Sequence, residues 1–199
     1  MYYPEIKADF DRDIATHEIK IVMDEGLNRH IIFSRPNSND YRFDLITYKG
    51  GLLFRGDMGV LVFERLNDMF EFFRDKRINT GYWAEKLVAV DPRGYESWSW
   101  DKFKAAVKHD LDNHCETMHD QEKITSLREE VDDELHECEE DEYSSVQMIR
   151  NFDHEGFSFV DFWEHDLKDY TFHYVWACFA IVWAIEQYDK HKSTEPKGQ

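Results

Sequence analysis

Histidine and cysteine side chains, the residue types that bind zinc, gather in one part of the sequence. They are His109, His114, Cys115, His119, His136 and Cys138. Cys115 and His119 are four residues apart, so a helix would carry both on one face. A structural zinc site needs four ligands and a catalytic site three, and this spacing matches no zinc finger. We therefore predict no metal and no other cofactor. A metal-dependent enzyme is the third hypothesis, with its site built from His114, Cys115 and His119 or from the pair of Asp44 and Asp57.

Three carboxylates fall on or between strands that the sequence predicts to be neighbours in one sheet. Metal-dependent nucleases carry catalytic carboxylates at such positions. They are Asp44, Asp57 and Glu64. Such a nuclease would carry a Glu-x-Lys pattern, whereas Glu64 is followed directly by Arg65. No serine nucleophile motif and no phosphate-binding glycine loop stands out in the sequence. We therefore predict no catalytic residues, and we predict that the protein is not an enzyme.

Arginines and tyrosines along the same strands have the chemistry to hold a small anion such as a nucleotide. The set is Arg29, Arg35, Tyr41, Arg42, Tyr48 and Arg55. Guanidinium groups would pair with phosphate while a tyrosine ring stacks on a base. The alternative is that these arginines offset nearby carboxylates such as Asp44 and Asp57. Binding or sequestering a small anionic ligand is therefore the second hypothesis for function.

A dense run of carboxylates is the strongest signal in the sequence. Between His109 and Glu142 there are 15 acidic residues against only Lys123 and Arg128. The acids expected to bind a partner are Glu129, Glu130, Asp132, Asp133, Glu134, Glu137, Glu139, Glu140, Asp141 and Glu142. Nucleic acids are recognised largely through closely spaced negative charge, so a helix that presents these side chains could occupy a basic groove. The alternative is a helix face that is merely solvated.

The elements that carry these residues are predicted from their periodicity. Tyr41–Tyr48 alternates, with Phe43 and Leu45 on one face, and the turns at Lys49-Gly50-Gly51 and Gly56-Asp57-Met58-Gly59 predict hairpins. The sequence therefore predicts an antiparallel β-meander over about 17–65, packed against a helical layer over 67–191. The fold class is α+β, with one strongly acidic helix, in a single domain of residues 1–191 followed by a flexible tail at 192–199.

The helical half is expected to begin at Asn67, a good N-cap, and to include a helix capped by Ser97 or Ser99. Apolar residues from Ile124 to Cys138 recur three or four positions apart and predict the amphipathic acidic helix. Phe157–Tyr170 is expected to be helical. Tyr170–Tyr188 is apolar nearly all round, which predicts a central core helix with Trp176 and Phe179 buried, although one side of it could instead form a homodimer interface.

The composition limits the cellular compartment and the kinds of partner that we expect for this protein. The formal net charge is −18, which repels nucleic acid and attracts basic surfaces, so the expected partner is a protein with a basic, nucleic-acid-binding type of surface and not nucleic acid itself. Three cysteines give no disulfide framework, and the first residues do not resemble a secretion signal. The apolar run between Asp169 and Glu186 is shorter than a membrane span, so we predict a cytoplasmic protein.

Three blocks of the sequence are similar to a known group of proteins. They are HIIFSRPNSNDYRFDLITYKGGLLFRGDMGVLVFERLNDMFEFFR, INTGYWAEKLVAVD and DFWEHDLKDYTFHYVWACFAIVWAIEQYD. They resemble a family of uncharacterised accessory proteins of tailed phages and prophages. The resemblance implies a phage protein that acts in the bacterial host cytoplasm against a host defence system, as anti-CRISPR proteins do. The first hypothesis is therefore a non-catalytic inhibitor that binds a host defence or DNA-processing complex through its acidic helix, which would mimic nucleic acid.

Overall fold

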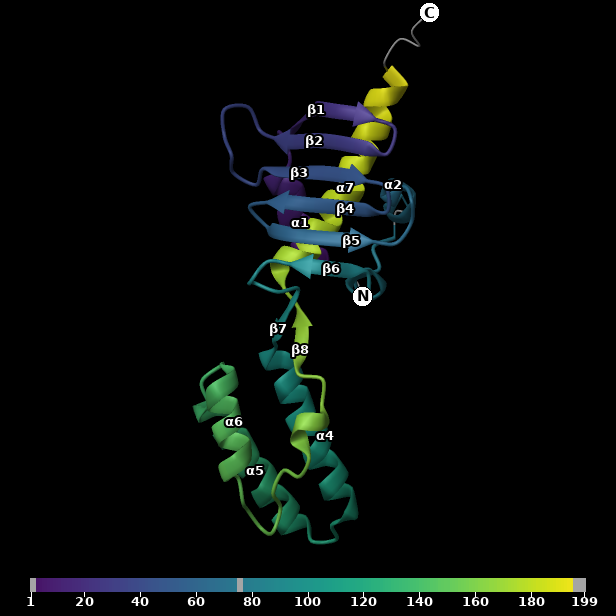
Figure 1. Cartoon of the computed structure of the whole chain (residues 1–199). Helices are drawn as coiled ribbons and strands as arrows, with labels where there is room; N and C mark the ends of the chain where they lie inside the picture. Colours follow the sequence, from purple (N-terminus) through teal and green to yellow (C-terminus); the bar gives the residue numbers. More distant parts are fainter. Residues whose placement is uncertain (1–2, 75–76, 195–199) are drawn as a thin grey trace, which may run out of the picture. The chain divides into compact units, whose positions relative to one another are not determined.

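The computed structural model describes residues 3–74 and 77–194, which form two compact units (Figure 1). The first unit runs to Tyr95 and resumes at Tyr170, and the second unit is Glu96–Asp169. The sequence predicts one domain over 1–191, but the buried apolar side chains form two separate clusters, one in each unit. Two cores form because the Glu96–Asp169 helices bury their apolar stripes against one another.

The first unit is built on a six-stranded antiparallel sheet in the order β1-β2-β3-β4-β5-β6. The strands are β1 (Glu18–Glu25), β2 (Asn28–Ser34), β3 (Phe43–Tyr48), β4 (Gly51–Gly56), β5 (Gly59–Glu64) and β6 (Leu87–Val90). The predicted meander and the α+β class are confirmed. Gly50 takes φ +94° in the β3–β4 turn, a conformation that a side chain would oppose. The sixth strand lies in the region predicted to be helical.

Helices cover one face of this sheet. In Figure 1, α1 (Pro4–Asp13) and α7 (Phe172–Thr194) run behind the strands. Two short helices, α2 (Met69–Phe73) and α3 (Thr80–Ala84), complete the unit. The cap of α2 is Asp68, whose side chain accepts the Phe70 N–H, and not the expected Asn67. Lys192–Thr194 of the predicted tail continues α7, and residues 195–199 lie outside the described residues.

Trp176 on α7 lies at the centre of the first core and is fully buried. Its ring packs edge-on against Phe10 at 5.1 Å and Phe43 at 5.8 Å between centroids, and its Nε1–H donates to the Asp13 carboxylate at 3.1 Å. The core assignment of this helix is therefore confirmed for Trp176. Phe179 is only partly buried and stacks on Phe10 of α1 at 6.0 Å. Tyr170, expected to begin the helix, lies instead in the strand Lys168–Tyr170.

The second unit contains α4 (Trp100–Thr117), α5 (Gln121–Glu137), α6 (Glu142–Asn151), a 3-10 turn at Phe162–Glu164, and the two-stranded sheet of β7 (Glu96–Trp98) and β8 (Lys168–Tyr170). Ser99 caps α4 as predicted, by accepting the Lys102 N–H. The predicted helix over Phe157–Tyr170 is wrong. Asp161 adopts a left-handed φ of 53°, which ends helical geometry, and Phe157 enters the core from irregular backbone while Phe162 enters it from the 3-10 turn.

Replacing Trp176 with Ala is expected to lower the free energy of unfolding by about 3–5 kcal/mol, because a large buried ring leaves a cavity. Trp176→Phe keeps much of the packing but leaves the buried Asp13 carboxylate without this donor, and is expected to cost about 1–3 kcal/mol. Urea denaturation followed by circular dichroism, with light scattering to report mass, measures both. An unchanged denaturation midpoint in Trp176→Ala would contradict the core position.

Candidate functional site

The carboxylates of the second unit are held on helices by an apolar core beneath them. Leu127 and Val131 of α5 are buried in one cluster with Phe103, Val107 and Leu111 of α4. Because these residues recur at helical spacing, the polar residues between them must point outward. The acidic side chains of α5 are therefore on a folded scaffold and not on a loose chain.

The ten predicted acids do not share a single helix. Glu129 to Glu137 lie on α5, which ends where Cys138 takes an extended conformation at φ −70° and ψ 131°. Glu139 and Glu140 lie in the connection. Asp141 caps α6 by accepting the Ser144 N–H at 2.9 Å, and the hydrogen bonds to the Ser144 backbone and hydroxyl lower the pKa of its carboxyl. The break arises because this cap favours a new helix start over continuation of α5.

Nearly all of these acids are exposed, with Asp141 intermediate. The two basic residues of α5 pair with carboxylates outside the run: Lys123 with Glu155 at 2.7 Å and Arg128 with Asp112 at 2.8 Å. Arg128 also attracts Asp132, and the His154 Nδ1 lies 4.0 Å from Glu130. No lysine or arginine of the described residues forms an ion pair within 4.0 Å with any of the ten acids.

The whole second unit shares this imbalance. It holds 23 acidic and 7 basic residues, a net charge of −16, whereas the entire chain has −18. The remaining net charge of the first unit is therefore only −2. The field of the protein originates almost wholly in the second unit, and a basic surface approaching it would be attracted over about a Debye length, roughly 8–10 Å at physiological salt.

The structure does not bring the proposed zinc ligands together. Cys115 is buried in the second core, His119 is exposed beyond the end of α4, and the His114 ring lies 4.7 Å from the Phe157 ring. Burial raises the pKa of the Cys138 thiol, which donates to the Glu139 carbonyl. Among residues 3–74 and 77–194, no three His, Cys, Asp or Glu side chains converge in a metal-binding geometry.

The arginines of the meander divide between the two faces of the sheet. Arg29 lies on the α7 side, where it forms two 2.9 Å hydrogen bonds with Asp68 and lies 4.5 Å over the Phe70 ring. Although burial opposes charge there, the bonds to Asp68 and Tyr188 raise the pKa of the guanidinium. Arg35 donates to the Asp13 carbonyl at 3.1 Å. Both arginines therefore stabilise the core side of the unit.

Arg42 and Arg55 lie on the other face, around the almost fully buried carboxylate of Asp44. Arg55 donates to Asp44 at 2.9 Å, His30 Nε2 donates at 3.0 Å, and Arg42 lies 3.3 Å away. A hollow of about 250 Å³ adjoins them, lined also by Asn39, Gly56 and Asp57. Arg42 and Arg55, two of the six residues predicted to bind an anionic ligand, thus lie together, but the group between them is a carboxylate.

The tyrosines and the remaining carboxylates are placed elsewhere. Tyr41 stacks on the core residue Trp176 at 6.3 Å, and Tyr48 lies over Gly51 while its hydroxyl donates to Glu64 at 3.1 Å. The Asp57 carboxylate accepts the Tyr41 N–H at 2.6 Å. Asp44, Asp57 and Glu64 therefore each have a separate structural partner.

Two polar pairs in the second unit were not found from the sequence. His165 lies 2.8 Å from Asp110, beside a groove of about 680 Å³ that Phe157 and Phe159 also line. Ser126 Oγ lies 3.0 Å from His154 Nε2. Because Glu130 is 4.0 Å from the other ring nitrogen, beyond hydrogen-bond distance, it does not orient that ring as the acid of a catalytic triad does.

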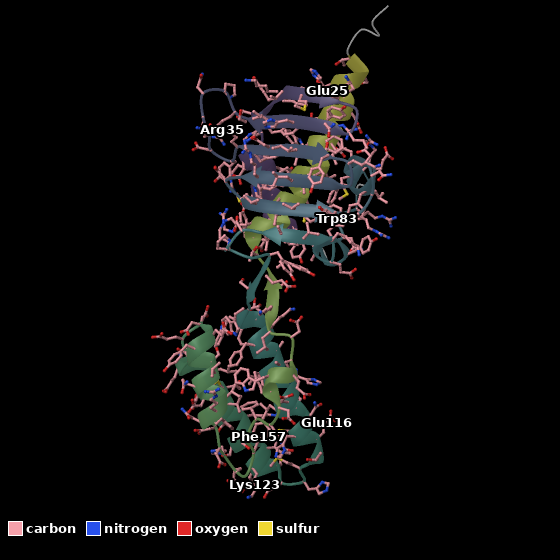
Figure 2. All side chains as sticks on the ribbon, in the orientation of Figure 1. Glu25, Arg35, Trp83, Glu116, Lys123 and Phe157 are labelled. Carbon is pink, nitrogen blue, oxygen red and sulfur yellow. The ribbon has the colours of Figure 1, made fainter. Side chains whose placement is uncertain are left out.

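Phe157, labelled in Figure 2, also lines this groove. Its position could not be predicted from periodicity, because it lies in irregular backbone.

Comparison of the chain with protein-family models, curated proteins and solved structures finds no match in any of the three. Across the described residues, none of the helices combines the length and the apolar composition needed to cross a bilayer.

The Asp44 cluster has a measurable titration. Burial would raise the pKa of Asp44, but the hydrogen bonds from His30 and Arg55 and the charge of Arg42 outweigh it and hold the pKa below 3.8. Stabilisation by the charged carboxylate is therefore complete above the unfolded-state value, about 3.9, and is lost as the pH falls through the lower folded-state value. Carbon-13 NMR titration of the Asp44 carboxyl is expected to show the low value and an increase in Arg55→Gln; an ordinary pKa in the unmodified chain would contradict the cluster.

Proposed function

We propose that this chain is a non-catalytic binding protein whose acidic second unit occupies a basic, nucleic-acid-binding type of surface on a host protein and thereby inhibits it. The observation that carries the proposal is the run of largely exposed carboxylates from Glu129 to Glu142, which lie on α5, in the connection that follows it and at the start of α6. Proteins that bind nucleic acid place lysines and arginines to meet regularly spaced phosphates. Carboxylates held on a scaffold are chemically suited to meet the same cations.

The division of charge between the two units supports a binding role for the second. An acidic composition that served only solubility would be spread over the whole surface, but the first unit is close to neutral. The basic residues of the second unit pair largely outside the run, as Lys102 does with Asp166 at 2.6 Å. The acids from Glu129 to Glu137 therefore remain available to an external partner.

The cellular setting of the proposal comes from the sequence resemblance. A phage accessory protein would act in the bacterial cytoplasm, and a defence or DNA-processing complex is the kind of target that has a basic groove. Binding of a small anion by Arg42 and Arg55 is the second candidate, favoured by the hollow beside them. Their shared contact with Asp44 weakens it, since that carboxylate would repel the anion.

Reversing one outward row of α5, with Glu129, Asp133 and Glu137 all changed to Lys, is expected to weaken partner binding at least tenfold. These residues are four apart and exposed, and lysine near a helix C-terminus interacts favourably with the helix dipole, so folding is retained. The partner is first captured from bacterial lysate with the unmodified chain at about 50 mM and about 500 mM salt, because charge pairing weakens as salt screens it. Its affinity for the variant is then measured with the purified proteins.

A matched control makes the same charge change in the first unit, with Glu5, Glu18 and Asp40 changed to Lys. All three are exposed and form no ion pair in the described chain. This control is expected to bind the partner normally, and duplex DNA is expected to compete with the unmodified chain. Equal binding by both variants, or loss of binding in both, would contradict a role for the acidic helices.

A further inference from the structure

The sheet of the first unit has one face that no helix of that unit covers among the described residues (Figure 1). Alternate residues of each strand point to this open face. The pairing register places six of them in one row across all six strands: Met23, His30, Ile46, Leu53, Val62 and Ala89. Ile46, Leu53 and Val62 neither belong to the first core nor pack against it. An apolar band therefore crosses the middle of the open face.

The two rows beside this band carry opposite charges. The basic flank contains Lys20 and Arg55 in the row next to the band, with Arg42 beside them. Two acids, Asp44 and Glu18, share this flank, so that three basic and two acidic residues leave it a net charge of +1. The other row contains Glu25, paired with Asn28, and Glu64, paired with Gly51. The open face is thus basic on one flank, apolar in the middle and acidic on the other flank.

This pattern is complementary to itself. Two copies can meet face to face about a two-fold axis that lies in the interface, either along the strands or across them. An axis along the strands places each flank over the same flank of the other copy, so that like charges meet. An axis across the strands, along the apolar row, places the basic flank over the acidic flank twice and the apolar row over itself. Each β1 then faces the β1 of the other copy, which brings Lys20 near Glu25.

We propose that this open sheet face is the homodimer interface of the chain, with the two-fold axis running along the apolar row. The apolar band supplies the buried centre and the charged flanks supply the rim and set the orientation, which is the usual division in protein interfaces. Face-to-face sheets pack about 10 Å apart with strands within about 30° of each other. The proposal does not depend on the acidic second unit or on its partner.

The size of the face sets the expected strength. Six strands about 4.8 Å apart and about six residues long give a footprint of roughly 500 Å², toward the small end of specific interfaces. The dimer is therefore expected to dissociate in the micromolar range, about 1–100 µM. Sedimentation of the full chain over this range is expected to show a reversible shift from 24.0 kDa to twice that mass.

Three sets of variants test the interface. Leu53→Lys puts a charge at the centre of the band and is expected to weaken dimerisation at least tenfold, while Val160→Lys, at a 73% exposed apolar residue of the second unit, is expected to change nothing. Lys20→Glu and Glu25→Lys are each expected to weaken it several-fold, and the double exchange is expected to restore it. Both residues are exposed on an edge strand and carry no ion pair in the described chain, so the exchange is not expected to affect folding.

The outcomes separate the possibilities. A chain that stays monomeric across the concentration range overturns the proposal, as does a dimer that Leu53→Lys leaves intact. If the Lys20 and Glu25 single changes weaken the dimer but the double exchange fails to restore it, the proposed axis is wrong. Circular dichroism of each variant confirms the fold, and rescue by the double exchange cannot arise from loss of folding.

Discussion

The first unit depends on the docking of α7, a helix too apolar to be stable in water by itself. Three polar groups on it fix where it lies. Trp176 donates to Asp13 of α1, the Tyr174 hydroxyl donates to the Thr80 carbonyl at 2.7 Å, and the Tyr188 hydroxyl donates to Asp24 of β1 at 2.9 Å. Apolar packing alone would tolerate a slip along the sheet, but a slip would break these three bonds and would leave the buried Asp13 carboxylate without the Trp176 donor. The register of the whole layer therefore rests on three bonds to three different elements.

The two proposed surfaces are expected to respond differently to solution conditions, because different forces would hold their partners. Binding to the acidic helices would depend on charge that is exposed to water, so added salt would weaken it. Binding to the open sheet face would depend mainly on apolar area, which excluded salts such as sulfate strengthen. One contact could therefore be kept while the other is released.

Local signals in the sequence predicted much of this structure. Alternation in Tyr41–Tyr48 placed Phe43 and Leu45 inside, the glycine turns placed the hairpins, and Ser99 started α4. The outward position of Glu129 and Asp133 followed from the stripe through Leu127 and Val131. Each of these depends on neighbours within a few residues, which is the range that periodicity and capping report.

Most of the errors involve contacts between distant residues, although the N-cap of α2 was misplaced by only one position, at Asn67 instead of Asp68. Nothing near Arg29 indicates that it pairs with Asp68 behind the sheet, and nothing near Phe157 indicates that it enters a core from irregular backbone. The break between α5 and α6 had a weak local signal, since Asp141 precedes Ser144 at capping distance, but the apolar stripe concealed it. The separation into two units depends on which helices bury one another, and a single sequence does not encode that choice locally.

The order in which the chain is synthesised has a consequence for the first unit. Its sheet is complete at Val90, yet α7 begins only at Phe172, after the ribosome has made all of Glu96–Asp169. At about 5–20 residues per second, the α7 residues that cover the sheet are made roughly 4–16 seconds after the last strand. Until then Ile31, Phe33 and Phe43, which α7 helps to bury, have no cover from that helix. The position of Glu96–Asp169 in the sequence thus separates in time the synthesis of the sheet from the synthesis of the helix that completes its core.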